Sequence, residues 1–154
     1  MKYKKILAFS FTVAFSLLFP SIIGRIHKYR QAAFSRASWL GDTKTMKVLL
    51  VAGADVNEPL AAYINPLVAA SESGNPEAIH LLLDHGARID QRDENGWTAL
   101  MYAAGAGQRE SVRVLLSSGA DVHAVGRRGT ALSIAALARH PEIVNMLKQA
   151  GARS

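Results

Sequence analysis

Apolar and small residues in most of this chain follow a helical spacing that returns at a fixed interval. The clearest unit runs from Gly96 to Val122 and contains two apolar faces with i, i+3, i+4 spacing, which predicts two short helices. Gly105 and Gly107 separate the two faces, and Gly119 follows the second, where glycine enters the left-handed conformation without steric cost. The two faces consist of Leu100, Ala103 and Ala104, and of Val112, Leu115 and Leu116.

Residues that favour a helix start precede each first helix. The hydroxyl of Thr98 is expected to accept a hydrogen bond from a backbone N–H that the first helical turn leaves unpaired. Thr130 and Asn65 occupy the same place in neighbouring units, and Pro66 stands at a first helical position, where its missing N–H is no loss. The helix starts are therefore predicted at these positions.

The unit recurs along the chain. Gly-Ala pairs begin at Gly53, Gly86, Gly119 and Gly151, with separations of 33, 33 and 32 residues. An apolar pair in the second helix keeps the same period for three units, and in the last unit its second member is Lys148. Each helix pair can bury its apolar side only against a neighbour, so the pattern predicts an all-α fold of stacked pairs.

The period, the T-A-L-x-x-A-A openings and the G-A-D-V ending resemble the ankyrin repeat over about residues 31–154. The resemblance implies a solenoid with hairpin-like loops and units at about 31–63, 64–96, 97–128 and 129–154. It also implies an interaction scaffold without a common active site. The first and last units are degenerate, as expected for caps, because terminal repeats present one face to water.

The chain departs from the family pattern in two ways. The family's T-P-L-H appears as N-P-L-V, T-A-L-M and T-A-L-S, so the histidine that bridges neighbouring repeats is absent. This absence predicts looser hydrogen bonding between units. The last unit also lacks one residue before Thr130, which predicts a distorted hairpin near Arg127, Arg128 and Gly129.

Charge is unevenly distributed along the chain. The sequence pI of 9.9 suggests a nucleic-acid partner. However, residues 1–36 hold seven Lys and Arg and no acidic residue, whereas residues 37–154 hold 11 basic and 12 acidic side chains. The basicity therefore belongs to the N-terminus, and a nucleic-acid partner is not expected. Without cysteine, disulfides and thiol chemistry are excluded, which fits a reducing compartment or a bridge-free periplasmic protein.

The N-terminus combines Lys2, Lys4 and Lys5 with an apolar run over residues 6–23, the pattern of an export signal. The run is also long enough to span a bilayer core of about 30 Å. A good cleavage site is missing and basic residues follow, so a retained single-pass anchor over 1–24, with the repeats outside the cytoplasm, is favoured. A cleaved signal peptide with a secreted or periplasmic product, or a soluble hydrophobic helix, are the alternatives.

Residues 25–36 are expected to form a basic helix that leads into the first unit. This helix is interpreted as a solvated linker at headgroup level, with contact to anionic lipid as the alternative.

Catalytic and cofactor motifs are missing from the sequence. His80 and His85 have no acidic or cysteine neighbours at metal-ligand spacing, and His80 occupies a slot that is polar in every unit. Neither a G-x-S-x-G nor a glycine-rich nucleotide motif is present. The sequence therefore predicts a protein that is not an enzyme and that needs no cofactor and no metal.

The family resemblance implies that a partner binds the concave side, which hairpin tips and first helices line. The helix ends there include Trp39, Glu72, Gly105 and Leu137. The first hairpin is apolar, and it either folds back on the first unit, faces a partner or contacts the bilayer. The candidate partner-binding residues are Trp39, Leu60, Tyr63, Ile64, Glu94, Asn95, Trp97, Arg127, Arg128 and Leu137.

Aromatic residues and arginines are enriched among binding hot spots. We therefore expect Trp39, Tyr63 and Trp97 to form an apolar groove, with Arg127 and Arg128 selecting an acidic end. The predicted function is a monomeric, membrane-tethered or exported module that binds another protein. An inhibitor or immunity-type protein that blocks an enzyme, and an enzyme built on a repeat scaffold, are the alternatives.

Overall fold

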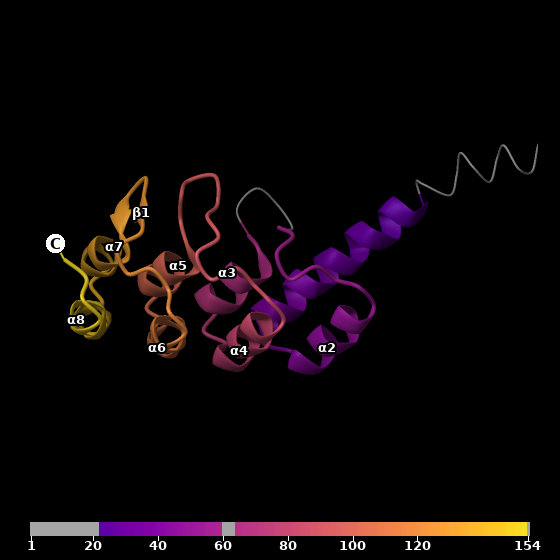
Figure 1. The fold of residues 1–154 in the computed structure, drawn as a ribbon, viewed down its shortest axis with the longest axis horizontal. Helices are drawn as coiled ribbons and strands as arrows, with labels where there is room; N and C mark the ends of the chain where they lie inside the picture. Colours follow the sequence, from indigo (N-terminus) through magenta and orange to yellow (C-terminus); the bar gives the residue numbers. More distant parts are fainter. Residues whose placement is uncertain (1–21, 60–63, 154) are drawn as a thin grey trace, which may run out of the picture.

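Pairs of short helices follow one another along the chain in a computed structural model that describes residues 22–59 and 64–153 (Figure 1). The first described helix covers residues 22–40. The remaining elements, in chain order, are α2 (Thr43–Val51), α3 (Pro66–Glu72), α4 (Pro76–Asp84), α5 (Ala99–Gly105), α6 (Arg109–Ser117), β1 (Val125–Gly126), β2 (Gly129–Thr130), α7 (Ala131–Leu137) and α8 (Pro141–Gln149).

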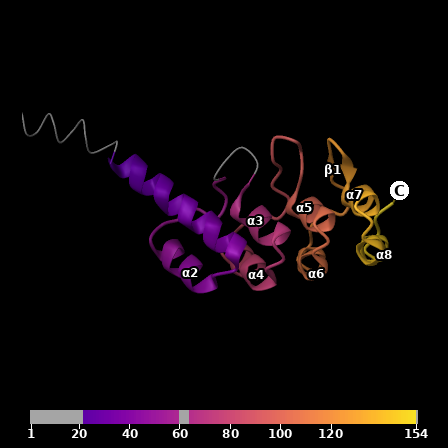
Figure 2. The ribbon, with the colours of Figure 1, turned by 180° about the vertical axis from the view of Figure 1, so that it is seen from behind.

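The helices form two layers. The first helices of the units, α3, α5 and α7, pack side by side in one row, and α4, α6 and α8 form the second row (Figure 1). The loops between units project beyond the first row, and the view from behind shows the same order of elements (Figure 2). The described part of the chain is therefore a helical solenoid, as the 33-residue period predicts.

The core runs without interruption from Phe34 to Leu147. Leu67, Leu100 and Leu132 occupy equivalent positions in the first helices, and each is at most 5% exposed. Burying a leucine side chain contributes about 1.5–3 kcal/mol, so this column of leucines holds the stack together.

Two of the three predicted helix caps form. The side-chain oxygen of Asn65 accepts from the backbone N–H of Val68 at 2.8 Å, and the hydroxyl of Thr130 accepts from Ser133 at 3.3 Å. Thr98 stands at the N-cap of α5 as predicted, but its capping bond is absent, because its buried hydroxyl has no hydrogen-bond partner within the described residues.

A row of side chains ties neighbouring units together. The residue before each second helix hydrogen-bonds to a backbone carbonyl oxygen at the end of the preceding unit's first helix. These bonds run from Asn75 to Trp39 at 2.7 Å, from Gln108 to Glu72 at 3.0 Å, and from His140 Nε2 to Gly105 at 3.2 Å. The bridging histidine of the family pattern is absent, but these bonds connect the units at another position.

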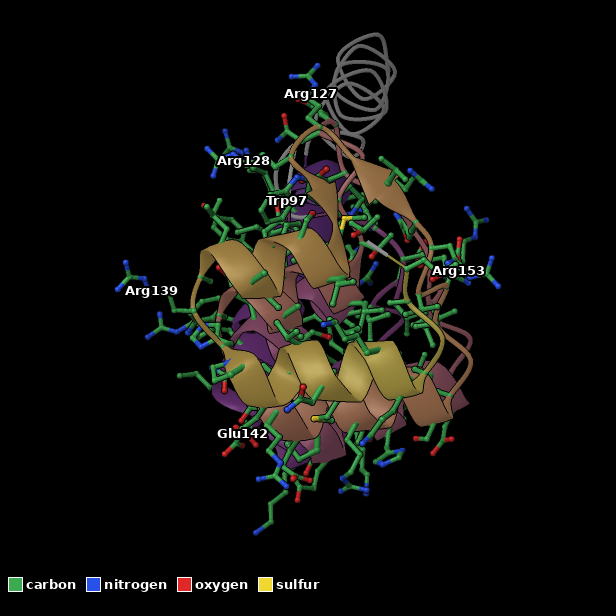
Figure 3. The ribbon with its side chains drawn as sticks, turned by 90° about the vertical axis from the view of Figure 1, so that its left-hand side faces the viewer. Trp97, Arg127, Arg128, Arg139, Glu142 and Arg153 are labelled. Carbon is green, nitrogen blue, oxygen red and sulfur yellow. The ribbon has the colours of Figure 1, made fainter. Side chains whose placement is uncertain are left out.

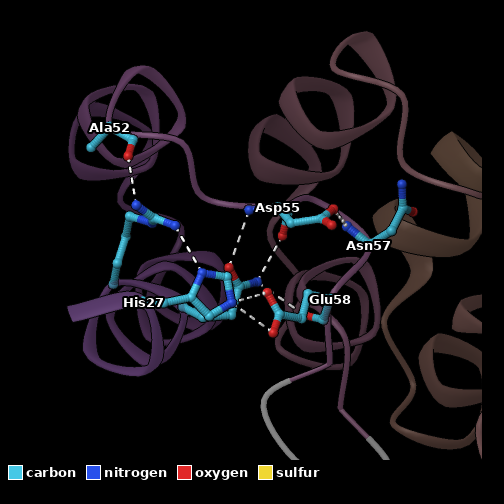
Figure 4. A network of polar contacts seen from close by, with 7 residues as sticks. His27, Ala52, Asp55, Asn57 and Glu58 are labelled. Carbon is cyan, nitrogen blue, oxygen red and sulfur yellow. Dashed lines mark hydrogen bonds and ion pairs between the residues drawn. The ribbon is translucent and has the colours of Figure 1, made fainter. Parts of the chain in front are cut away.

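The helix over residues 22–40 ends as the first helix of the first unit, and its Gln31 makes contacts that a preceding repeat makes in later units. The side-chain oxygen of Gln31 accepts from the backbone N–H of Asp55 at 3.1 Å, and its amide donates to the carbonyl oxygens of Asp55 and Glu58 at 2.7 and 3.0 Å (Figure 4). Gln31, Phe34 and Ser35 are at most 3% exposed. This part of the predicted basic linker is therefore packed against the first unit.

A second set of contacts fixes the helix one turn earlier. Arg30 donates to the carbonyl oxygen of Ala52 at the end of α2 and to Nδ1 of His27, both at 2.9 Å (Figure 4). Nε2 of His27 then lies 2.8 Å from a carboxylate oxygen of Glu58. With Nδ1 accepting, Nε2 carries the proton and donates to Glu58.

The predicted membrane anchor falls almost entirely outside the described residues. Ile22 and Ile23, at its end, are each 51% exposed. No helix within 22–59 or 64–153 combines the length and the apolar character that a membrane crossing needs. The anchor over 1–24 stays a prediction from the sequence.

The hairpin of the last unit keeps its strand pairing, but its turn departs from the favoured two-residue geometry. Val125 pairs with Thr130 and Gly126 with Gly129, which leaves Arg127 and Arg128 as the two turn residues. The favoured two-residue turns need a positive φ at the first or at both turn residues, and Arg139 alone among the described non-glycine residues has one; Gly129, just after the turn, adopts a φ of +105°. The last hairpin therefore pairs regularly but turns in a less favoured geometry, which agrees in direction with the predicted distortion.

Candidate functional site

A pocket of about 360 Å³ lies where the last hairpin meets the first helices. We call it the Trp97 pocket. Its walls come from three units, so it exists only in the assembled stack. It is lined chiefly by Glu72, Trp97, Tyr102, Gly105, Arg128 and Leu137. A smaller hollow of about 310 Å³ shares Trp97, Tyr102 and Arg128 and continues toward Asn95 and Arg127.

Two aromatic rings form the apolar centre of the pocket. The rings of Trp97 and Tyr102 meet edge to face, with centroids 5.1 Å apart and planes at 60°. This is a favoured geometry for aromatic pairs. Both rings are partly buried, so their exposed faces are presented on a fixed base.

The carboxylate of Asp93 holds this aromatic pair in place. One oxygen accepts from the backbone N–H groups of Asn95 and Trp97 at 2.7 and 2.8 Å, and the other accepts from the Tyr102 hydroxyl at 2.7 Å. A single side chain therefore folds the loop that carries Trp97 and fixes the hydroxyl end of Tyr102.

The hairpin approaches Trp97 closely because residue 126 is glycine. A Cβ atom at Gly126 would lie 2.8 Å from Cδ1 of Trp97. Arg128 then places its guanidinium carbon 6.0 Å from the centroid of the Trp97 ring, at the outer range of a cation–π contact. Figure 3 shows Trp97 beside the hairpin, with Arg127 and Arg128 projecting from it on the same side of the molecule.

Asn95 fixes the other turn arginine. The backbone N–H of Arg127 donates to the carbonyl oxygen of Asn95 at 3.0 Å, and its guanidinium donates to the Asn95 side chain at 3.1 Å. These bonds connect the hairpins of neighbouring units. Most of the guanidinium donors of Arg127 remain exposed.

The hollow itself arises from a glycine in a row of larger residues. Trp39, Glu72, Gly105 and Leu137 stand at equivalent positions near the ends of successive first helices. Gly105 contributes no side chain, which leaves a gap between Glu72 and Leu137. A Cβ atom there would lie 3.1 Å from a methyl group of Ile134, so the gap is closely bounded.

The two ends of the pocket carry opposite charges. Burial raises the pKa of the Glu72 carboxyl. Among the residues that the structure describes, the Glu72 carboxylate takes part in no hydrogen bond and no ion pair. Arg128 forms no ion pair with any of these residues either. The pocket is therefore acidic toward α3, aromatic in the middle and basic at the hairpin.

The structure brings together only some of the predicted site residues. Asn95, Trp97, Arg127, Arg128 and Leu137 line the two connected hollows, and Leu137 is 81% exposed.

The other predicted site residues lie apart from the pocket or outside the described residues. Trp39 is 44% exposed in an earlier unit, and neither it nor Ile64 or Glu94 contributes to the pocket walls. Leu60 and Tyr63 lie outside the described residues, so the predicted Trp39–Tyr63–Trp97 groove is not seen as one surface.

Sequence reasoning missed Asp93 and Tyr102. Tyr102 stands at the position where the neighbouring units have the apolar residues Ala69 and Ile134. A tyrosine hydroxyl at this otherwise apolar position could have indicated the site. In the sequence, Asp93 is one of five consecutive polar residues in the loop over 91–95. Its role depends on a hydrogen bond to a residue nine positions later.

The part of the chain that the structure describes holds no cluster of three His, Asp or Glu side chains able to bind a metal ion. A larger open hollow of about 820 Å³ lies between the end of α2 and the turn after α4. It is lined mainly by turn residues 53–57, with Lys47 and His85 at its edge. It lacks the converging aromatic and charged groups of the Trp97 pocket.

The fold is a repeat solenoid with a pocket on its hairpin side. Residues 34–126 match the family described as ankyrin repeats (3 copies), and this match covers more than half of the chain. The chain therefore belongs to the ankyrin-repeat family.

Similarity to curated proteins is local. Over 56 residues the chain is 39% identical to "Potassium channel AKT1" of Oryza sativa subsp. indica and, equally, to that of Oryza sativa subsp. japonica. The matched stretch covers 36% of this chain but 6% of either channel.

Proposed function

We propose that this protein is an interaction module that binds a segment of another protein in the Trp97 pocket. The observation that carries the proposal is the aromatic pair of Trp97 and Tyr102, which Asp93 fixes beside two exposed arginines. Ankyrin repeats are generally non-enzymatic scaffolds for protein interactions, which favours binding over catalysis. The protein binds through the pocket as a monomeric repeat domain.

The geometry of the pocket favours tight binding. Tryptophan, tyrosine and arginine are enriched among binding hot spots, and the two aromatic residues offer a large contact area with few rotatable bonds. Here the Trp97 ring is already fixed by the loop around Asp93, so little side-chain freedom is lost on binding. A partner side chain that enters the gap over Gly105 contacts residues from three units at once.

The proposal includes a membrane tether. The basic residues before the apolar run 6–23, and the basic residues after it, support a retained anchor with the repeats outside the cytoplasm. Carbonate extraction of membranes and N-terminal sequencing of the mature chain test this part. A chain that stays with the membrane and begins at its encoded N-terminus is expected. A mature chain that begins near residue 25 would contradict retention and indicate export with cleavage.

Site-specific photo-crosslinking in the expressing cell tests the pocket. A photoreactive amino acid replaces Leu137 in the full-length chain, and a second variant carries it at Gln149, an exposed residue at the end of α8. A discrete protein adduct is expected from position 137 and not from position 149. The adducted protein is then identified by mass spectrometry.

Substitutions decide whether the adduct reflects the pocket. Trp97→Ala should weaken partner binding by about 2 kcal/mol or more, roughly 30-fold. Trp39→Ala removes the other tryptophan, which lies outside the pocket, and it should leave the adduct unchanged. Circular dichroism should show that both variants remain folded, and the melting temperature of Trp97→Ala should fall because the Trp97 ring packs against the core. An adduct that survives Trp97→Ala would show that the partner binds elsewhere.

A further inference from the structure

We infer that the occupant of the Trp97 pocket is a peptide segment with a cationic side chain at one end, a carboxylate at the other and an apolar side chain between them. This inference rests on the proposed function. It assigns the chemistry and the direction of the bound segment, and each end of the pocket supports one part of it.

The acidic end calls for a cation. The Glu72 carboxylate is partly shielded from water by the pocket walls, and among the described residues no donor or positive charge compensates it. A lysine or arginine of the occupant would restore the lost solvation by an ion pair. Its aliphatic stem would lie along the Leu137 side of the gap, because long cationic side chains pack their stems on apolar surface.

The basic end calls for a carboxylate. Arg128 makes no ion pair within the described part of the chain, and Arg127 uses one side-chain hydrogen bond to Asn95. Both guanidinium groups are exposed on the two turn residues of the hairpin (Figure 3). A guanidinium binds a carboxylate with two parallel hydrogen bonds, so the arginines favour an acidic side chain or a C-terminal carboxylate.

The middle of the pocket takes an apolar side chain. Trp97 and Tyr102 present ring surface, and the missing side chain at Gly105 leaves space bounded by Ile134 and Leu137. First helices two units apart are separated by about 16–20 Å, and an extended chain rises about 3.3 Å per residue. With Glu72 and Arg128 both reaching inward, the two charges of the occupant should stand about three to five residues apart.

The opposite charges also fix the direction of the segment. The reversed segment would place a cation against Arg127 and Arg128 and a carboxylate against Glu72, and like charges in contact are strongly disfavoured. A uniformly anionic partner, such as nucleic acid or an anionic membrane surface, would meet the Glu72 carboxylate. The charge pattern therefore favours a protein segment of mixed charge.

A random 12-residue peptide library displayed on phage tests this inference on the full-length protein in detergent. Selection should enrich peptides with a lysine or arginine three to five positions from an acid or the C-terminus, with an apolar residue between them. Synthetic versions are then measured by fluorescence polarisation. Glu72→Gln and the double variant Arg127→Ala/Arg128→Ala should each weaken binding at least tenfold, whereas Glu94→Gln should leave it unchanged.

A charge reversal at Glu72 distinguishes a direct ion pair with the peptide from a nonspecific effect of the substitution on binding. Glu72→Lys should reject the enriched peptides and bind variants in which the cation is replaced by glutamate. Gly105→Met fills the gap, where its Cβ atom would press on a methyl group of Ile134 at 3.1 Å, and it should abolish binding while circular dichroism shows that the protein remains folded. Gly105→Ala, the smaller substitution, should weaken binding less.

The outcomes distinguish this inference from the proposed function. If Trp97→Ala abolishes peptide binding but the charge variants do not, the pocket binds protein and the charge pattern is wrong. If no enriched peptide depends on Trp97, the proposed function itself is contradicted. Binding of phosphatidylglycerol vesicles that requires Trp97 and increases in Glu72→Gln would overturn the inference in favour of an anionic surface.

Discussion

The side-chain oxygen of Gln31 accepts a hydrogen bond from the backbone N–H of Asp55, with 3.1 Å between oxygen and nitrogen. In the next two units the equivalent N–H groups, of Arg88 and Asp121, donate to the side chains of Asn57 and Asp90. A side chain of the helix over 22–40 thus makes the bond that a preceding repeat makes elsewhere. The helix therefore closes the N-terminal end of the solenoid.

Replacing Gln31 by alanine should destabilise the first unit. The change removes three hydrogen bonds at a site where Gln31 is 3% exposed, and it leaves the polar groups of Asp55 and Glu58 without their partner. The free energy of unfolding should fall by about 1–3 kcal/mol. Urea denaturation measures it, and the amide of Asp55 should lose protection from hydrogen exchange.

Gln149→Ala is the control for this change, because Gln149 is exposed at the end of α8. Its effect should stay within about 0.5 kcal/mol. Equal stability of the Gln31 variant and the parent would show that this helix does not cap the array.

Gly126→Ala should displace the last hairpin from Trp97. The new Cβ atom would lie 2.8 Å from the Trp97 ring and 3.1 Å from the carbonyl oxygen of Gly96, which is too close for either to remain in place. Overpacking of this kind costs about 1–3 kcal/mol. In a Trp39→Phe background, the emission of Trp97 should shift, and the protein should unfold at lower urea.

The matched glycine is Gly24, which lies in the helix over 22–40, where a Cβ atom would have no other atom within 4 Å beyond its own helical turn. Gly24→Ala should leave the emission of Trp97 unchanged and stabilise the helix by about 0.5–1 kcal/mol. Unchanged emission in both variants would mean that the hairpin does not pack on the ring.

Glu72 should make stability depend on pH in the direction opposite to that of a salt-bridged carboxylate. Burial raises its pKa, so the folded chain holds this proton more tightly than the unfolded chain. At a pH below the ordinary glutamate pKa, Glu72 is protonated in both the folded and the unfolded chain, and it does not lower the free energy of unfolding. Its contribution to stability becomes unfavourable as the pH rises through the raised value.

Glu72→Gln removes this dependence. The melting temperature of the variant should match that of the parent at acid pH and exceed it at neutral pH. Glu94→Gln, at an exposed loop position, should follow the parent throughout. A variant that gains no stability toward neutral pH would show that the Glu72 carboxylate is fully solvated.

The three helix starts should respond differently to loss of their polar side chains. Asn65→Ala removes a formed cap and should cost about 1 kcal/mol. Thr98→Val keeps the shape of the side chain and removes a buried hydroxyl without a partner in the described structure, so stability should be unchanged or higher. Chemical denaturation compares the two, and a large loss for Thr98→Val would indicate an unseen hydrogen bond to that hydroxyl.

Local patterns predicted most of the fold. Helix starts at Asn65 and Thr130 and the turn at Gly119, with φ of +89°, depend on a few neighbouring residues, so the sequence indicates them directly. The missing capping bond at Thr98 has a physical cause. Its hydroxyl faces the core at 1% exposure, and packing between units decided its environment.

The candidate site could be predicted only in part. Trp97, Arg127 and Arg128 were evident because large or charged residues in a hairpin have few structural uses. Tyr102 and Asp93 were not evident, because their roles follow from a contact between a loop and a helix. The predicted link to Trp39 assumed one continuous groove, whereas the walls of the hollow belong to the later units.

By itself, the sequence determined the repeat period, the helix pairs, the glycine turns and the absence of cysteine chemistry, because each of these follows from short-range spacing or composition. Only the tertiary structure decided that Glu72, Trp97 and Leu137 share one pocket and that Gln31 makes a contact that a preceding repeat makes in later units. These residues are tens of positions apart. Their proximity depends on how side chains from successive units fill, or at Gly105 fail to fill, the space between them.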